Sequence, residues 1–301
     1  MAATIVTGGS GFLGAHVVRA VADRGGPVVA VDAAPPPPDV LALWAGRDVE
    51  HRVLDVRDPG PVFAHVRPDV VIHAAAVTNG DRATLDAVNR GGTAAVLAAA
   101  GSARVVYVSS ASVYADNAAV LDENSPVRTD PADYPASKLA GERLATGAGA
   151  VIARVAACYG PLERDTGTRR VMSPPYAAAR AALDGRPVRA DPRSAARSFD
   201  LTWVGDIAEG IATLAATASP RHRAYNVGSG IAITLAELAC AVTSAVGAHR
   251  PGEDAYLLSL PPGQRAGVLD VSRLCELPVP RPTPLSDGLA RYVEWLREHA
   301  C

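Results

Sequence analysis

The stretch Thr4-Ile-Val-Thr-Gly-Gly-Ser-Gly-Phe-Leu-Gly14 decides the fold of this chain. Its glycines at positions 8, 11 and 14 stand between a short β-branched run and a helical run that begins near Ala15. Glycine permits positive φ in the turn and close approach of a phosphate, and the N-terminus of the next helix offers free N–H groups. An ordinary tight turn is the alternative. The strand–turn–helix context favours a dinucleotide-binding loop formed by Gly8, Gly11 and Gly14.

Short β-branched runs alternate with longer Ala- and Leu-rich runs through the first half of the chain. The expected strands after the first are residues 28–31, 51–54, 70–72, 104–108 and 151–155, and the expected helices are residues 14–24, 85–100 and 136–146. Near-continuous apolar strands separated by helices are typical of a parallel sheet covered on both faces. We therefore predict an α/β fold, with a Rossmann-type doubly wound parallel sheet.

Beyond Cys158 this rhythm loosens. The expected elements there are helices over residues 176–183, 204–218, 235–246 and 286–299 and a strand over 224–227, with proline-rich loops at 33–39 and 278–284. We expect residues 1–158 plus about 198–232 to form the nucleotide-binding domain. Residues from about 159 to 197 and from 233 to 301 are then expected to form a smaller, partly interleaved C-terminal substrate-binding region.

Composition and charge exclude several classes of protein. Hydrophobic residues make up 49% and charged residues 20% of the 301 residues, which is typical of an ordered globular protein. The net charge of −2 gives no electrostatic footprint for nucleic acid or an anionic membrane. The run after Met1 lacks the basic flank of a signal peptide, and no run reaches the roughly 18 apolar residues of a membrane helix. We therefore expect a cytoplasmic protein.

Cysteine usage indicates neither disulfides nor a metal site. The four cysteines, Cys158, Cys240, Cys275 and Cys301, are scattered, without a C-x-x-C pair or a suitably spaced histidine. Cys158 has apolar neighbours and no nearby histidine to activate it, so we interpret it as a small core residue.

Two aspartates that follow strands refine the nucleotide prediction. Asp32 comes 18 residues after Gly14, where a carboxylate accepts hydrogen bonds from the adenosine ribose and repels a 2′-phosphate. Because no arginine stands at 33 or 34, this position favours NAD over NADP; a turn or helix cap is the alternative. Asp55, after the strand at 51–54, is placed to meet the adenine amino group, although a lone aspartate there is more often a cap.

Tyr134 and Lys138 are four residues apart at the start of an expected helix, so their side chains share one face. An ammonium beside a phenol lowers the phenol's pKa from near 10 toward neutrality, which suits proton exchange with an alcohol. Ser110 ends a predicted strand, where ligands bind in open α/β sheets, and its hydroxyl is suited to hold the reacting oxygen. A surface tyrosine and lysine are the alternative interpretation.

Taken together, these motifs resemble the extended short-chain dehydrogenase/reductase family, in the branch of NAD-dependent epimerases and dehydratases typified by UDP-glucose 4-epimerase. The matching segments occur in the family's order and span nearly the whole chain. They are residues 7–14, 55–58, 73–76, 88–93, 109–114, 134–138, 159–161, 200–206 and 225–230.

The resemblance implies roles for individual residues. Ser110, Tyr134 and Lys138 would be the catalytic residues, and Lys138 would also hold the nicotinamide ribose. The implied NAD contacts are Phe12 and Leu13 along the pyrophosphate, Asp55 and Val56 at the adenine, Ala74, Ala75 and Ala76 along the cofactor path, and Asn89 from the following helix. The resemblance also implies a homodimer, packed through the helix of Tyr134 and Lys138 and its neighbour.

The sequence departs from the family's pattern at two places. Ala111 and Ser112 stand where the dehydratases carry an Asp-Glu pair, which argues against sugar 4,6-dehydration. Ala157 stands where many sugar-nucleotide enzymes carry an asparagine that contacts the diphosphate region. This second departure weakens the case for a nucleoside-diphosphate sugar without excluding one.

Several arginines follow the Tyr159-Gly-Pro161 motif, in the region where the family builds its substrate pocket. Guanidinium groups suit carboxylate and phosphate, although a solvated charged loop is an equal alternative. The candidates are Arg164, Arg169, Arg170 and Arg197. Our hypothesis is an anionic substrate gripped by Arg169 and Arg197, with Thr78 as a further substrate contact.

We therefore expect an NAD-dependent oxidoreductase that acts on a secondary alcohol of a sugar or sugar-nucleotide-like substrate. If the ketone recovers its hydride on the other face, the enzyme is an epimerase, which the family's commonest activity favours. If the ketone leaves and NADH exchanges, it is an NAD-dependent dehydrogenase of a small sugar acid or polyol. A non-catalytic nucleotide-sensing protein is the third alternative, against which the complete Ser110, Tyr134 and Lys138 set argues.

Overall fold

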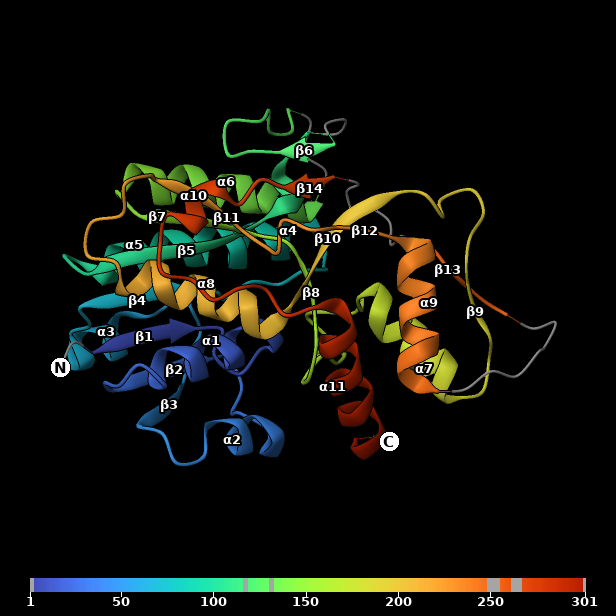
Figure 1. Ribbon diagram of the computed structural model, residues 1–301. Coiled ribbons are helices and arrows are strands. Elements are labelled where there is room, and N and C mark those ends of the chain that lie inside the picture. Colours follow the sequence, from blue (N-terminus) through green and yellow to red (C-terminus); the bar gives the residue numbers. More distant parts are fainter. Residues whose placement is uncertain (1–2, 116–118, 130–132, 248–254, 261–266, 300–301) are drawn as a thin grey trace.

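A parallel sheet forms the centre of the molecule (Figure 1). The computed structural model describes residues 3–115, 119–129, 133–247, 255–260 and 267–299. Seven strands pair side by side, all in parallel, in the order β11-β7-β5-β4-β1-β2-β3. They are β1 (Thr4–Thr7), β2 (Val28–Asp32), β3 (Val49–Val53), β4 (Val70–His73), β5 (Arg104–Ser110), β7 (Val151–Val155) and β11 (Ala224–Val227). The predicted Rossmann-type doubly wound sheet is confirmed.

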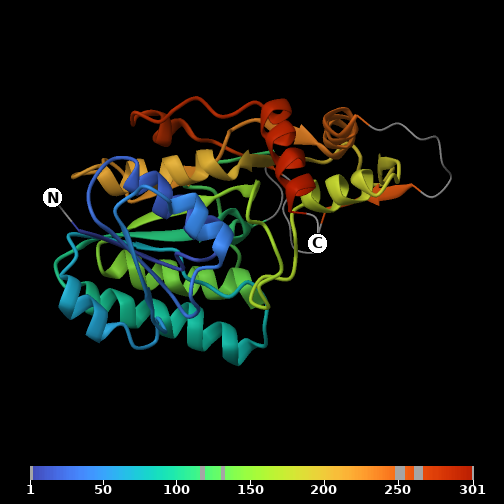
Figure 2. The same cartoon turned by 90° about the horizontal axis from the view of Figure 1, so that it is seen from below.

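Helices cover both faces of this sheet, so the main body has three layers (Figure 2). One face carries α1 (Phe12–Ala22) and α8 (Val204–Ala216), which pack against each other. The other face carries α3 (Gly60–Val66), α5 (Gly92–Ala100) and α6 (Asp133–Gly147). Because the sheet is shielded from water on both sides, every residue of its central strands β1 and β4 is buried, rather than every second one.

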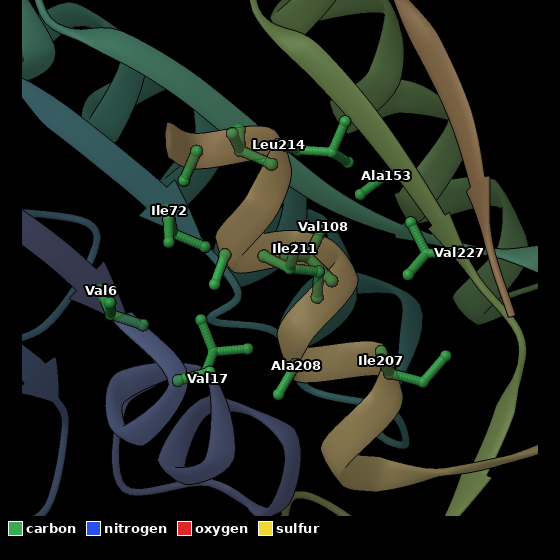
Figure 3. Packing of buried hydrophobic residues seen from close by; sticks show 14 of the residues in the cluster. Val6, Val17, Ile72, Val108, Ala153, Ile207, Ala208, Ile211, Leu214 and Val227 are labelled. Carbon is green, nitrogen blue, oxygen red and sulfur yellow. The ribbon is translucent and has the colours of Figure 1, made fainter. Parts of the chain in front are cut away.

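Helix α8 shows how the core is closed (Figure 3). Ile207, Ala208, Ile211 and Leu214 follow the i, i+1, i+4, i+7 spacing of one helical face and are at most 1% exposed. They point toward apolar side chains of the strands and of α1, which include Val6, Val17, Ile72, Val108, Ala153 and Val227. Full burial of one such large aliphatic side chain contributes about 1.5–3 kcal/mol. This packing fixes α1, whose N-terminus follows the glycine-rich loop.

A second apolar cluster lies beyond the carboxyl end of β7. Three helices build it: α7 (Pro174–Leu183), α9 (Leu235–Val246) and α11 (Leu285–Glu298) (Figure 1). Short strands accompany them, namely β8 (Ala157–Tyr159), β10 (Ser198–Trp203) and β12 (Ala232–Thr234) in one sheet and β9 (Val188–Ala190) paired with β13 (Tyr256–Leu258). Leu269 of β14 (Val268–Leu269), which pairs with β6 (Val120–Leu121), and Leu274 of α10 (Ser272–Cys275) pack in the main core. The domain boundaries given above stay a prediction.

Most predicted elements are confirmed, and three keep the predicted bounds: the strands 151–155 and 224–227 and the helix 235–246. The helix predicted over 85–100 is composite, since α4 (Arg82–Leu85) runs into η1 (Asp86–Gly91), a π-helical turn, before α5. The loop predicted over 33–39 is wrong at its end, because α2 (Pro38–Trp44) begins there. Proline is tolerated at the first helical position because the backbone N–H that it lacks would have no hydrogen-bond acceptor within the helix.

Three further findings concern the described part of the chain. There, Cys158, Cys240 and Cys275 are free thiols, and Cys301 lies outside it. The same residues hold no group of three His, Cys, Asp or Glu side chains arranged for a metal ion. None of the helices within these ranges has the length and apolar character needed to cross a bilayer.

Candidate active site

The glycine-rich loop between β1 and α1 has no room for a side chain at Gly8, nor has the first turn of α1 at Gly14. Gly8 has φ +72°, and a Cβ there would lie 2.7 Å from the Cα of Ala75. A Cβ on Gly14 would lie only 1.8 Å from the carbonyl oxygen of Gly8. The first turn of α1 therefore packs directly on the loop backbone, which explains why glycine is required at both positions.

The N-terminus of α1 is a suitable site for the diphosphate of a dinucleotide. Gly11 is its N-cap residue and supplies no side chain to bond the first-turn amides. The N–H groups of Phe12, Leu13 and Gly14 have no acceptor within the helix, because the first residues of any α-helix lack one. Free amides at a helix N-terminus favour an anionic group. The predicted loop thus fits the group that it is expected to hold.

Asp32 ends β2 beside this loop. Its Oδ2 accepts a hydrogen bond of 3.0 Å from the backbone N–H of Ser10. Burial raises the pKa of Asp32, while hydrogen bonds from loop amides, that of Ser10 first, oppose the rise. The carboxylate is thus held at the edge of the predicted dinucleotide site, where the adenosine ribose is expected.

The two residues predicted at the adenine differ in their surroundings. Asp55 is exposed and its carboxylate is engaged by Arg57, whose Nε lies 2.9 Å from Oδ1; the same hydrogen bonds lower the pKa of Asp55. Val56 is buried, and a Cβ on Gly92 of α5 would lie 2.8 Å from its Cγ2. An adenine contact at Asp55 therefore stays a prediction, and it would compete with Arg57.

Asn89 organises the segment that leaves β4. It is 1% exposed and lies in η1; its Oδ1 accepts from the N–H of Val77 at 2.8 Å. Its Nδ2 donates to the carbonyl of Val77 at 2.9 Å and to Oγ of Ser137 at 2.8 Å. Asn89 thereby joins the predicted cofactor path at Ala74, Ala75 and Ala76 to the residue before Lys138.

His73 is a buried core histidine, as its lone occurrence on an apolar strand indicates. Its Nδ1 lies 2.7 Å from Oγ1 of Thr7 and its Nε2 lies 3.0 Å from Oγ1 of Thr93. Burial, and next the charge of Lys138, lower its pKa to about 3. His73 therefore stays neutral at any physiological pH and ties β4 to β1 and α5.

The three predicted catalytic residues meet at the carboxyl end of β5. Ser110 is the last residue of β5, and Tyr134 and Lys138 occupy the first turns of α6. The Ser110 side chain lies close enough to the Tyr134 phenol to lower its pKa. Ser110 and the α6 pair are thus brought together from segments 24 residues apart.

A glycine on α6 sets the position of Lys138. A Cβ on Gly141 would lie 2.0 Å from the hydroxyl of Tyr107 on β5, so α6 approaches the sheet closely at this point. Nζ of Lys138 consequently lies 4.4 Å from the centre of the Tyr107 ring. Lys138 is 2% exposed and is the only lysine of the 301-residue chain.

The pKa values of the pair differ from the sequence-based expectation. Burial lowers the pKa of Lys138 to about 7, although the charge of Glu142 opposes this. Burial raises the pKa of Tyr134 to about 12, and the cation that lowers it is Arg169. This direction is opposite to the prediction that Lys138 brings the phenol toward neutrality. The effect of burial on both pKa values is larger than the effect of the neighbouring charges, and Lys138 is the group whose pKa lies near neutral pH.

Two loops are joined beside these residues. Both the N–H and the hydroxyl of Thr78 donate to the carbonyl of Thr168, at 2.9 and 3.0 Å. The side-chain Nδ2 of Asn79 donates to the carbonyl of Gly167 at 3.2 Å, and its Oδ1 accepts from the N–H of Arg170 at 2.9 Å. The segment after β4 and the segment around residue 168 therefore form one connected wall.

The four candidate arginines have different environments. Arg169 is half-buried, and its charge lowers the pKa of Tyr134 and of Cys158. Arg164 pairs with Asp39 of α2 at 2.8 Å. Arg170 and Arg197 are exposed, the latter just before β10. The structure therefore brings Arg169 to the catalytic residues, whereas joint action with Arg197 stays a prediction.

Three further residues at the site escaped the sequence analysis. Glu163 is buried and contacts Arg169, Tyr107 supports Lys138, and Ser112 has a buried Oγ without a hydrogen-bond partner among the described residues. In the sequence, only the position of Glu163, two residues after the Tyr159-Gly-Pro161 motif, indicates a role. Cys158 packs against the main core, as predicted, and burial raises the pKa of its thiol to about 12.

A phosphate-binding loop at a strand–helix turn and converging Ser110, Tyr134 and Lys138 define a Rossmann-fold oxidoreductase of the short-chain dehydrogenase/reductase type. The family model described as the NAD dependent epimerase/dehydratase family matches residues 4–228, well over half of the chain. The chain belongs to this NAD-dependent enzyme family, and its cofactor is NAD.

Individual relatives span this family's reactions. The dTDP-glucose 4,6-dehydratase of Streptomyces griseus is 30% identical and aligns with 98% of this chain and 94% of its own. The UDP-glucose 4-epimerase of Mycolicibacterium smegmatis is also 30% identical, over 98% of both chains. The solved structure of MoeE5 in complex with UDP-glucuronic acid and NAD has a TM-score of 0.81, 27% identity and coverage of 98% of this chain and 99% of its own.

Proposed function

We propose that this protein is a sugar or sugar-nucleotide epimerase that inverts a secondary alcohol through a transient ketone. The observation that supports this most directly is the placement of Ser110, at the carboxyl end of β5, next to Tyr134 and Lys138 in the first turns of α6. Ligands of open α/β sheets bind at this edge.

Each residue has a defined task in this proposal. The phenolate form of Tyr134 takes the proton from the substrate hydroxyl, and the charge of Arg169, which lowers the pKa of the phenol, favours that form. Ser110 donates a hydrogen bond to the substrate oxygen as it becomes a carbonyl. Lys138 supplies positive charge below its pKa of about 7 and exchanges a proton with its surroundings near neutral pH. NAD, when bound, supplies the hydride acceptor. The glycine-rich loop, the α1 N-terminus and Asp32 are the residues that would hold it.

The residues directly after Ser110 favour epimerisation over dehydration. Ala111 and Ser112 begin η2 (Ala111–Val113), so no carboxylate stands at either position to help expel water. The unpartnered Oγ of Ser112 instead offers a hydrogen bond to a substrate hydroxyl. Wild-type protein incubated with UDP-glucose or UDP-glucuronic acid is therefore expected to form an epimer and no 4-keto-6-deoxy product, as NMR of the sugar ring will show.

Retention of the nucleotide separates epimerase from dehydrogenase. Acid release from freshly purified protein, followed by chromatography, is expected to yield close to one NAD per chain, because an epimerase returns its hydride without cofactor exchange. Nucleotide-free protein that binds added NAD and forms free NADH with polyols or sugar acids would support the dehydrogenase alternative. Protein that binds neither NAD nor NADP would overturn both.

The assembly, compartment and domain division are also proposals. We propose a homodimer packed through α5 and α6, in the cytoplasm, with the substrate bound between the nucleotide domain and the C-terminal region. Leu144 of α6 is 36% exposed, which is consistent with an apolar contact on that face. Light scattering of the purified chain, with Leu144→Glu as the disrupting variant, tests the dimer.

A further inference from the structure

Arg169 occupies an unusual position for a cation. Its Cζ lies 5.0 Å from the centre of the Phe12 ring at the start of α1, and its charge acts on the phenol of Tyr134. The head group thus lies between the predicted dinucleotide loop and the proton-transferring residue. A group on the substrate that neighbours the reacting carbon would meet it there.

A buried carboxylate fixes the direction of Arg169. Oε1 of Glu163 accepts from Nη2 of Arg169 at 2.7 Å, and no part of the Glu163 side chain is exposed. Glu163 also accepts from the N–H and the hydroxyl of Ser173, each at 2.7 Å, and from the Tyr292 hydroxyl at 2.9 Å. The Glu163 carboxylate therefore contacts Ser173 at the start of α7 and Tyr292 of α11, and it holds the guanidinium of Arg169 in place.

The backbone beside this carboxylate is constrained as well. Leu162, directly before Glu163, has φ +69° although it carries a side chain, and it is 3% exposed. Such a conformation costs free energy and persists only where surrounding contacts impose it. Glu163 is thus held in place from the backbone as well as through its side chain.

The pairing with Glu163 leaves one hydrogen-bond donor of the Arg169 guanidinium unpaired. Its Nε is buried and has no hydrogen-bond partner among the described residues. The buried Arg154–Glu142 pair, by contrast, uses both sides of the guanidinium fork, at 3.0 and 2.9 Å. An unpaired buried donor is unfavourable, so this N–H favours a bound acceptor.

We propose that Arg169 is a specificity residue that binds a carboxylate of the substrate close to the carbon that is oxidised, and that Glu163 is its positioning residue. The inference rests on the proposed function. A carboxylate oxygen satisfies the free Nε–H. The cation also offsets the substrate's negative charge, which would otherwise disfavour the Tyr134 phenolate. The substrate class is therefore a uronic acid or its nucleotide ester.

A matched ligand pair tests this directly by calorimetry on NAD-loaded protein. UDP-glucuronic acid and UDP-glucose differ only by a carboxylate in place of a hydroxymethyl group. We expect wild-type protein to bind the acid at least about tenfold more tightly. Arg169→Gln is expected to weaken binding of the acid roughly 10- to 100-fold and to change binding of the neutral sugar less than about threefold. Arg52→Gln, the same change at an exposed arginine of the edge strand β3, is the control and is expected to leave both affinities unchanged.

Positioning by Glu163 is tested separately. Glu163→Gln and Tyr292→Phe are expected to raise the KM for the acid while kcat changes little, and Arg169→Lys is expected to restore only part of the preference. Thermal unfolding of each variant identifies those that fail to fold, and Tyr292→Phe, which removes one hydroxyl, keeps the test available if Glu163→Gln does not fold.

Three outcomes overturn the proposal. In the first, the wild type binds the acid no more tightly than the neutral sugar. In the second, Arg169→Gln weakens the affinities for both ligands equally. In the third, Arg169→Gln lowers the affinity for NAD alone, which would make Arg169 a cofactor contact. If neither UDP-sugar binds, glucuronate against glucose is the deciding pair, and no preference there also overturns it. Because binding needs no turnover, selective acid binding without any epimerisation would remove the proposed function and leave the carboxylate site standing.

Discussion

Nζ of Lys138 lies over the face of the Tyr107 ring, 4.4 Å from its centre, and only 2% of the Lys138 surface is exposed to solvent. Every other basic position among the 29 Lys and Arg residues is an arginine. Lysine differs from arginine in that its pKa shifts readily when it is buried. The single lysine therefore stands where a titratable cation, rather than a permanent one, is useful.

Stability is expected to depend on pH through this lysine. The pKa of Lys138 is lowered from 10.5 to about 7, so between these values the unfolded chain binds more protons than the folded one. The unfavourable contribution is complete below about pH 7 and disappears as pH rises toward 10.5. Lys138→Met is therefore expected to raise the free energy of unfolding by a few kcal/mol at about pH 6 and by much less at about pH 9.5. Urea unfolding at both values measures this, and a pH-independent difference would contradict the burial of a charged lysine.

The ionisation of Lys138 is expected to respond to Glu142. The Glu142 charge raises the lysine's pKa, so Glu142→Gln is expected to move the basic limb of the pH–activity profile to lower pH. The same change leaves the buried Arg154 without its bidentate partner, at a cost of about 3–5 kcal/mol. Asp86→Asn, which breaks the exposed pair with Arg90, serves as control and is expected to cost less than about 0.5 kcal/mol. A pH profile that does not move would argue against coupling between residues 138 and 142.

Backbone contact at the glycine-rich loop predicts a severe effect of one methyl group. In Gly14→Ala the new Cβ would meet the Gly8 carbonyl oxygen at 1.8 Å, so α1 must shift away from the loop. We expect a loss of about 1–3 kcal/mol in stability and of at least about tenfold in NAD affinity. Gly147→Ala, at the end of α6 with nothing within 4 Å of the new Cβ, is the matched control. Equal NAD affinities of the two variants would show that the loop does not hold the cofactor.

The choice between NAD and NADP is expected to depend on Asp32. Its carboxylate is fixed by the N–H of Ser10 and would repel a 2′-phosphate. Asp32→Ser is expected to weaken NAD binding and to reduce the preference for NAD over NADP by roughly tenfold. Fluorescence titration with both nucleotides measures the ratio, and an unchanged ratio would place the adenosine ribose elsewhere.

The elements whose bounds could be predicted are those with a clear local sequence pattern. The strands 151–155 and 224–227 are mainly apolar and are each interrupted by one polar residue, Arg154 and Asn226. The helix 235–246 starts at the capping box of Thr234 and Glu237 and ends at Gly247. Local chemistry defines such elements completely. By contrast, α2 begins inside a run of prolines, and strands such as β8 and β9 have three residues each, so tertiary pairing rather than local pattern determines them.

The site shows a similar division. The glycine loop and the residues 110, 134 and 138 carry fixed spacings that identify them in the sequence. The choice of Arg169 among four arginines depends on the buried Glu163, on Phe12 and on the Thr78–Thr168 contact, which are brought together from distant segments. The pKa of Tyr134 was mispredicted for the same reason, because burial is a property of the folded site and not of the i, i+4 spacing.

The central claim is proton transfer by Tyr134, and the most direct measurement is reduction of bound NAD in a single turnover. Wild-type protein and Tyr134→Phe, loaded with equal NAD, are mixed with UDP-glucuronic acid while the absorbance of reduced nicotinamide is followed. We expect a rate roughly 10²- to 10⁴-fold lower in the variant, with NAD content and thermal stability unchanged. Reduction at the wild-type rate in Tyr134→Phe would contradict it.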